Sequence, residues 1–90
     1  MQSTKIVGKW IIVDGKVAED VNCRKINAMI SNELTQVADR ESGWIKLYKN
    51  PVRGEFWELD YPQSELQGGG PPTLEKLSQK EVQERYGMLP

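Results

Sequence analysis

The fold class is decided by residues 44–61, which read WIKLYKNPVRGEFWELDY. Two runs of alternating apolar and polar side chains, 44–49 and 55–61, flank a connection that is rich in turn-forming residues, 50–54. This pattern predicts a β-hairpin. We expect Lys49 to pair with Glu55, because that register joins opposite charges at this pair and again further along the strands. Each such pair supports the register by roughly a few tenths of a kcal/mol.

The expected register gives the hairpin two different faces. One face collects the apolar side chains of a core layer, namely Ile45, Leu47, Trp57 and Leu59. The other face carries three aromatic residues and several charges, namely Trp44, Tyr48, Phe56, Lys46, Glu58 and Asp60. The aromatic residues either form a second core layer beneath the C-terminal helix or stay partly exposed as the centre of a binding interface. The sequence leaves both interpretations open.

The other elements are predicted from periodicity and turn signals. A strand is expected over 9–13, and because apolar residues would line both of its faces we expect it to be central or covered on both sides. Asp14-Gly15 then signals a turn. A helix is expected from residue 19 or 20 to about residue 38. Its apolar stripe comprises Cys23, Ile26, Ile30, Leu34 and Val37.

The C-terminal part is expected to be irregular after Tyr61 and to form a last strand over 73–77. Ser78 and Glu81 then form the capping box of a short helix, which Gly87 ends. The predicted order is β-α-β-β-β-α. We therefore expect an α+β fold in which a mostly antiparallel sheet of about four strands packs with one long helix and one short C-terminal helix. Residues 1–90 are predicted to form a single domain.

The composition argues against catalysis. The chain contains no histidine and a single cysteine, Cys23, so the commonest general base and the commonest metal ligand are both missing. We expect no enzymatic activity, no cofactor and no metal site. Without a disulfide, and with no apolar run longer than Trp10–Val13, the chain is expected to be cytoplasmic and to have no membrane association.

Charge is unevenly distributed along a chain whose net charge is −1. Residues 54–75 contain acidic residues and no basic ones; the acids are Glu55, Glu58, Asp60, Glu65 and Glu75. Such a segment is either a solvated face or a field that steers a basic partner. We expect Glu58 and Asp60 to be surface charges. Because the aromatic half of the chain is also the acidic half, we expect no binding to nucleic acid.

The three consecutive glycines, Gly68, Gly69 and Gly70, do not form a phosphate-binding loop, since the two prolines that follow lack the N–H groups that such a loop needs. The glycines permit a close backbone passage or a positive φ. Alternatively, a partner protein binds this segment, since binding residues are often found on loops.

Residues 61–72, YPQSELQGGGPP, resemble the signature of the bacterial immunity protein 27 family. Similar stretches are found along most of the chain, namely Gly8-Lys9-Trp10, Val13-Asp14-Gly15-Lys16-Val17, Gly43-Trp44, Phe56-Trp57-Glu58-Leu59 and Glu84-Arg85-Tyr86-Gly87. The resemblance implies an immunity protein of a polymorphic toxin system, made beside a toxin and binding the toxin's C-terminal domain to protect the producing cell. The family often carries histidine where this chain has Gln67, so the resemblance assigns Gln67 no role.

The toxin-binding site is expected in the aromatic and acidic half of the chain. Its candidate residues are Trp44, Tyr48, Phe56, Glu58, Asp60, Ser64, Glu65, Gly68, Gly69 and Gly70. A nuclease, with its basic substrate cleft, is a toxin that the acidic segment would complement. One alternative is a small carboxylate-dependent enzyme or ligand-binding module acting around residues 54–75, which a buried carboxylate with a raised pKa in a deep pocket would indicate. Another is an accessory subunit whose stability depends on its partner.

Overall fold

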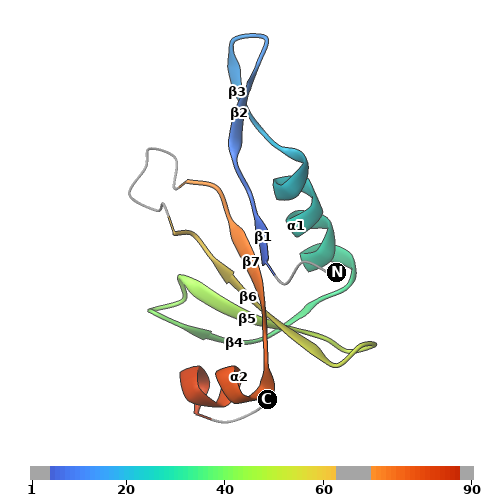
Figure 1. Cartoon of the computed structure of the whole chain (residues 1–90), viewed down its shortest axis with the longest axis vertical. Helices are drawn as coiled ribbons and strands as arrows, with labels where there is room; N and C mark the ends of the chain where they lie inside the picture. Colours follow the sequence, from blue (N-terminus) through green and yellow to red (C-terminus); the bar gives the residue numbers. More distant parts are fainter. Residues whose placement is uncertain (1–4, 63–69, 88–90) are drawn as a thin grey trace.

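A computed structural model describes residues 5–62 and 70–87 of the chain (Figure 1). An antiparallel five-stranded sheet in the order β1-β7-β6-β5-β4 forms the body of the molecule. Its strands are β1 Lys5–Val7, β4 Thr35–Arg40, β5 Ile45–Asn50, β6 Glu55–Asp60 and β7 Thr73–Leu77. A separate two-stranded sheet contains β2 Trp10–Val13 and β3 Lys16–Glu19. The helices are α1 Val21–Asn32 and α2 Gln79–Tyr86.

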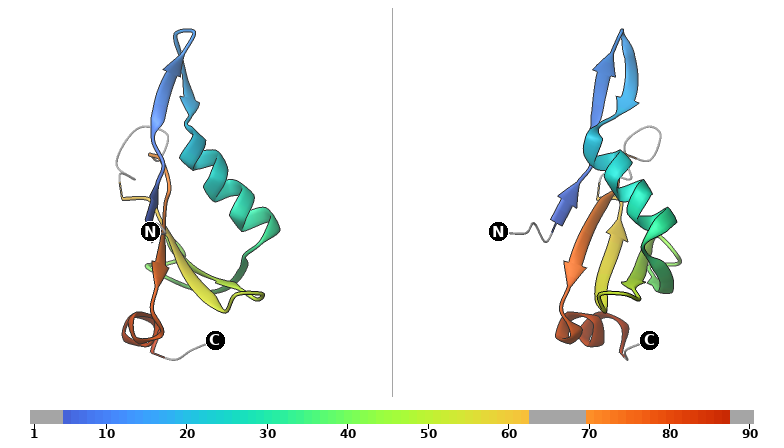
Figure 2. Two further views of the ribbon diagram at one scale, coloured as in Figure 1. Left: turned by 45° about the vertical axis from the view of Figure 1, so that its right-hand side comes forward. Right: turned by 90° about the vertical axis from the view of Figure 1, so that its right-hand side faces the viewer.

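The α+β class, the antiparallel sheet and the C-terminal helix are confirmed, with more strands than expected. The sheet has an apolar layer on each face, because alternate residues of each strand point to opposite sides. One layer lies against α1 and comprises Ile6, Ile26, Leu34, Tyr48, Trp57, Leu59 and Leu74. The other lies against α2 and comprises Leu47, Phe56, Leu77 and Val82. Figure 2 shows the two helices on either side of the sheet.

The β5–β6 register differs by one residue from the expected one. Asn50, and not Lys49, pairs with Glu55. The cause is the turn, in which the side-chain oxygen of Asn50 accepts hydrogen bonds from the N–H groups of Val52 and Arg53, each 3.0 Å long. The N–H of Gly54, at φ +71°, donates to the Asn50 carbonyl at 2.7 Å, so the loop has four residues and Asn50 belongs to the strand.

The shifted register corrects the expected division of the hairpin into faces. Tyr48 lies opposite Trp57, and Lys49 lies opposite Phe56, so Tyr48 and Phe56 point to different sides of the sheet. The hydrophobic pattern could not reveal this, because a one-residue slip is penalised only where one face is buried and the other is wet. Here both faces are covered by a helix, and either register sends apolar side chains into a core.

The long helix ends six residues before the expected boundary. The Asp20 side chain caps α1 by accepting from the Cys23 N–H at 2.8 Å, close to the predicted start. The expected end near Ala38 is wrong, because the chain leaves the helix after Asn32 and forms the edge strand β4. Leu34 continues the apolar spacing of the helix and is buried, but it lies in the connection between the two elements. The three- and four-residue spacing of apolar side chains therefore continues past the end of the helix and does not mark that end.

The expectation that residues 9–13 form a central or covered strand is wrong. Strand β2 pairs with β3 through a two-residue loop, in which Asp14 and Gly15 have φ values of +51° and +77°. Such positive values are typical of a tight hairpin loop. The hairpin projects from one end of a molecule whose extents are 45 × 28 × 23 Å (Figure 1).

A hydrogen bond and a tight packing contact, both at Gly8, fix the base of this hairpin. The Gly8 N–H donates to the Pro72 carbonyl at 2.8 Å, and a Cβ atom at Gly8 would lie 2.6 Å from the Cys23 sulfur. The close passage of backbone therefore occurs at Gly8. Gly70 has a φ of +68°, which is the second role that we expected of the glycine run.

The C-terminal elements agree with the sequence. Strand β7 has the expected bounds, and Ser78 and Glu81 form a reciprocal capping box at the start of α2. Gly87 ends the helix in a left-handed conformation. Within the described residues, neither helix has the length and apolar composition that a membrane crossing requires.

We predict that Asn50→Ala lowers the free energy of unfolding by about 1–2 kcal/mol, because it removes two hydrogen bonds that hold the β5–β6 turn. Urea denaturation measures the change. Asn32→Ala, at the exposed end of α1, is the matched control and should shift the free energy by less than about 0.5 kcal/mol. Equal effects of the two substitutions would show that the side-chain hydrogen bonds of Asn50 do not stabilise the turn.

Candidate functional site

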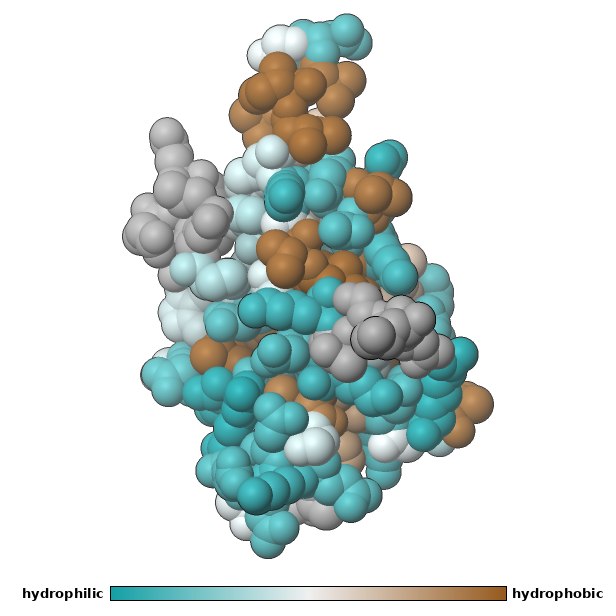
Figure 3. All heavy atoms as spheres, in the orientation of Figure 1, coloured by the Kyte–Doolittle hydropathy of each residue, from teal (hydrophilic) through white to brown (hydrophobic). Residues whose placement is uncertain are grey.

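Five large apolar side chains with exposed surface gather on the β2–β3 hairpin. Ile12 and Val17 keep 69% and 68% of their surface exposed, and Val13 keeps 49%. Trp10 and Ile11 are also exposed. Figure 3 shows these side chains as an apolar region at the end of the molecule. We call β2, β3 and their connecting loop, residues 10–19, the apolar arm.

Both faces of the apolar arm are apolar. Ile12 pairs with Val17, on the same face as Trp10, whereas Ile11 pairs with Ala18 on the opposite face. An isolated two-stranded hairpin is only marginally stable in water, and a contiguous exposed apolar surface usually marks an interaction site. The sequence analysis missed this surface. The signal was available in Asp14-Gly15 followed by a second apolar stretch, which is a strong hairpin pattern.

The base of the arm borders a hollow of about 430 Å³. Its lining includes Val7, Gly8, Lys9, Trp10, Pro62, Pro71 and Thr73. Pro62 follows Tyr61, whose ring packs edge-to-face against Trp44 with centroids 6.5 Å apart. Trp44 keeps 60% of its surface exposed. Exposed aromatic and apolar groups thus continue from the arm towards one end of β5.

The structure separates the ten residues of the expected site. Trp44 is exposed and Asp60 is partly exposed, whereas Tyr48, Phe56, Glu58 and Gly70 are buried. Both Tyr48 and Phe56 are core residues, but only Phe56 lies beneath the C-terminal helix as the core interpretation expected, since Tyr48 packs in the layer beneath α1. The remaining four candidates, Ser64, Glu65, Gly68 and Gly69, lie outside the described residues.

Glu58 is not the surface charge that we expected. Its side chain is buried, and its carboxylate accepts from Arg85 Nη1 at 2.6 Å and from the Tyr86 hydroxyl at 2.8 Å. Arg40 donates to the same carboxylate through Nε at 3.1 Å and Nη2 at 3.3 Å. The sequence analysis missed both arginines, because β4 and α2 are brought to Glu58 only by the fold.

These contacts set the protonation state of the network. Burial by itself raises the pKa of Glu58, but the hydrogen bonds from Arg40 and Tyr86 and the two arginine charges outweigh it and hold the pKa below its ordinary value. Burial and the neighbouring carboxylate raise the pKa of the Tyr86 hydroxyl. Glu58 is therefore an ionised structural group, the opposite of the raised carboxylate that an acid catalyst would use.

Internal ion pairs offset much of the charge of the acidic segment. Glu55 pairs with Lys76 at 3.0 Å, and Arg85 lies 4.0 Å from Glu75 as well as binding Glu58. The ion pair with Lys76 lowers the pKa of Glu55. The bases all come from outside residues 54–75, so the surface field of this segment is weaker than its sequence indicates.

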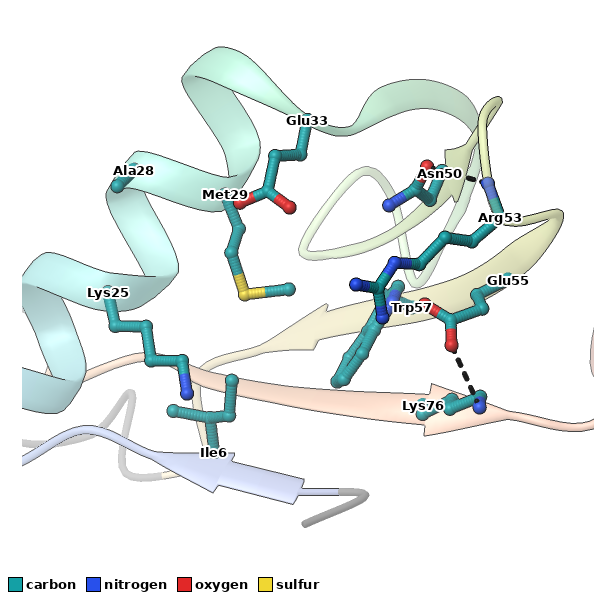
Figure 4. Close-up of a pocket in the computed structure, with 10 residues that line it drawn as sticks. All are labelled: Ile6, Lys25, Ala28, Met29, Glu33, Asn50, Arg53, Glu55, Trp57 and Lys76. Atoms are coloured by element: carbon teal, nitrogen blue, oxygen red, sulfur yellow. Dashed lines mark hydrogen bonds and ion pairs between the residues drawn. The ribbon is translucent and has the colours of Figure 1, made fainter. Parts of the chain in front are cut away.

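A second hollow, of about 490 Å³, lies between α1 and the β5–β6 turn (Figure 4). Its walls carry charges of both signs, from Lys25, Glu33, Arg53, Glu55 and Lys76, and its apolar lining comes from Ile6, Ala28, Met29 and Trp57. The buried indole N–H of Trp57 interacts with Glu55 without reaching hydrogen-bonding geometry. Across residues 5–62 and 70–87, no three metal-ligating side chains gather into a candidate metal site.

Comparison with known proteins identifies a family. The family described as immunity protein 27 matches residues 12–78 of the 90-residue chain, which includes most of the apolar arm and the whole of β4 to β7. The resemblance found in the sequence is therefore confirmed. No curated protein and no solved structure matches the chain.

We predict that Glu58→Gln lowers the free energy of unfolding at pH 7 by about 2 kcal/mol, because two arginines lose their shared counter-ion while remaining partly hydrated. Urea denaturation measures the loss. Glu84→Gln, on the exposed side of the same helix α2, is the matched control and should be nearly neutral. A loss no larger than that of the control would contradict a structural role for Glu58.

The same network predicts a pH dependence. Because the pKa of Glu58 is lower in the folded state, its contribution is complete above the ordinary pKa of a glutamate, about 4.3, and is lost as the pH falls through the folded value. The difference in unfolding free energy between the wild type and Glu58→Gln should therefore narrow from pH 7 towards pH 3. A difference that stays constant over this range would show that Glu58 does not titrate with a lowered pKa.

Proposed function

We propose that this chain, which belongs to the immunity protein 27 family, binds a cognate bacterial toxin domain and neutralises it in a one-to-one complex. It would act in the cytoplasm of the cell that makes the toxin, as a binding protein and not as an enzyme. The family match over residues 12–78 is the observation that carries the proposal.

The surface of the molecule supports a binding role. An inhibitor needs a preorganised surface that complements its target, and it needs no catalytic groups. The apolar arm offers exposed side chains such as Ile12 and Val17, which gain free energy when a partner removes them from water. Trp44 offers an exposed aromatic ring, held in place against Tyr61, of the kind that anchors protein interfaces.

Among the candidate residues predicted from the sequence, we propose that Trp44 and Asp60 face the toxin, since both reach the surface. Inside the fold, Tyr48 packs on the α1 side of the sheet, whereas Phe56 and Glu58 lie on the α2 side. A nuclease remains our proposed toxin class, because the basic surface of such a toxin would complement the acidic residues of this segment. Steering by this segment should nevertheless be modest, since Glu55 and Glu58 already have internal partners.

Co-expression tests the function directly. Cells that express the toxin domain encoded beside this chain should survive when the chain is present and should stop growing when it is absent. Colony counts after induction measure protection, and an immunity protein from a different family is the control. Equal killing with and without this chain would contradict the proposed function.

A substitution tests whether Trp44 contacts the toxin. We expect Trp44→Ala to raise the dissociation constant of the toxin complex by roughly tenfold or more, as the loss of an aromatic anchor typically does. Isothermal titration calorimetry measures the constant. Val52→Ala, at a side chain that is 92% exposed in the β5–β6 turn, is the control. If both variants bind as the wild type does, Trp44 does not contact the toxin.

A further inference from the structure

We infer that the apolar arm, residues 10–19, is the element that the toxin domain encloses, and that it enters a cleft of that domain with apolar walls and a polar floor. The inference rests on the proposed function and specifies which surface performs it and what kind of surface receives it. Its starting point is the way in which the arm is attached and exposed.

The arm is held at its base and free along its length. The Asp20 N–H donates to the Lys9 carbonyl at 3.2 Å, and the Asn27 side chain donates to Glu19 at 3.0 Å. Both bonds lie where the arm meets α1. Beyond them, β2 and β3 pair with each other and with no other strand of the described chain (Figures 1 and 2). The arm thus has a defined direction before any partner arrives.

The distribution of apolar side chains indicates the shape of the partner. Ile12 and Val17 lie on one face and Ile11 and Val13 on the other, and both faces are open to water. A flat partner surface would cover one face and leave the other exposed. Only a partner with two walls removes both faces from water, so the occupant must offer a cleft. Four-residue strands extend about 13 Å, a depth that a cleft between two elements can supply.

The tip of the arm indicates the chemistry of the floor. Asp14 lies in the loop and Lys16 directly follows it, so the end that would enter deepest carries a charge of each sign. Burying these charges against an apolar floor would be strongly unfavourable, and a polar floor is therefore needed. Pockets that bind small-molecule substrates and cofactors are usually lined by apolar side chains with a few placed polar groups. The arm would neutralise the toxin by occupying that cleft.

The test uses the purified toxin domain that is encoded beside this chain and two double variants, one for each face. Ile12→Ser with Val17→Ser removes one face, and Ile11→Ser with Val13→Ser removes the other. We expect each pair to raise the dissociation constant by roughly 100-fold. Val52→Ser, at a valine in the β5–β6 turn that is even more exposed, should leave the dissociation constant unchanged. Circular dichroism and urea denaturation verify that each variant keeps the folded core.

The outcomes separate the inference from the function on which it rests. If the wild type fails to bind the toxin domain, the proposed function is wrong. If the wild type binds and both double variants bind as tightly as the wild type, the proposed function stands and the arm is not the docking element. If only one of the two double variants binds the toxin more weakly, the toxin covers one face of the arm and does not enclose it in a cleft. A wild type that light scattering shows to be a dimer, and that these variants convert to a monomer, would assign the arm to a second copy instead.

Toxin kinetics test where the cleft lies. With the toxin's own substrate in increasing excess, the apparent inhibition constant of the wild-type chain should rise in proportion to substrate concentration, because arm and substrate would compete for one site. An inhibition constant that does not change with substrate would overturn the placement of the arm in the substrate cleft.

Discussion

The carboxylate of Glu58 ties together three parts of the molecule that lie far apart in the sequence. From the centre of the sheet it binds Arg40 on the edge strand β4 and Arg85 and Tyr86 on the C-terminal helix. A buried carboxylate without these partners would carry a large desolvation cost. The fold supplies these partners, so Glu58 is both buried and ionised, and its bonds to Arg85 and Tyr86 hold α2 over the sheet.

Because of these internal ion pairs, the acidic segment 54–75 is a weaker surface for attracting a basic partner than its sequence indicates. In the sequence, residues 54–75 look like a surface designed to attract a basic partner. In the fold, Glu55 and Glu58 neutralise cations supplied by β4, β7 and α2. The molecule consequently combines a body in which Glu55 and Glu58 are paired internally with an arm whose apolar side chains are not covered. The second part is the one with free energy available for binding.

Local chemistry explains where sequence reasoning succeeded. The capping box of Ser78 and Glu81 and the terminating Gly87 each involve groups only a few residues apart, so their patterns could be recognised directly. The turn at Asn50 was also recognised, but its side-chain hydrogen bonds determine the register and were not foreseen. That single residue decided whether Tyr48 and Phe56 would share a face.

The sequence by itself determined the α+β class, the turn and cap positions, the lack of histidine chemistry and the resemblance to the immunity protein 27 family. Only the tertiary structure decided the strand order, the register, the burial of Glu58 and the exposure of the arm. The physical reason is that each of these depends on contacts between distant segments. Because both faces of the sheet are covered, the apolar pattern of β5 and β6 does not determine which side chains pack against which helix. A strand such as β2, with apolar residues on both faces, has the same sequence pattern whether the protein core or a binding partner covers it.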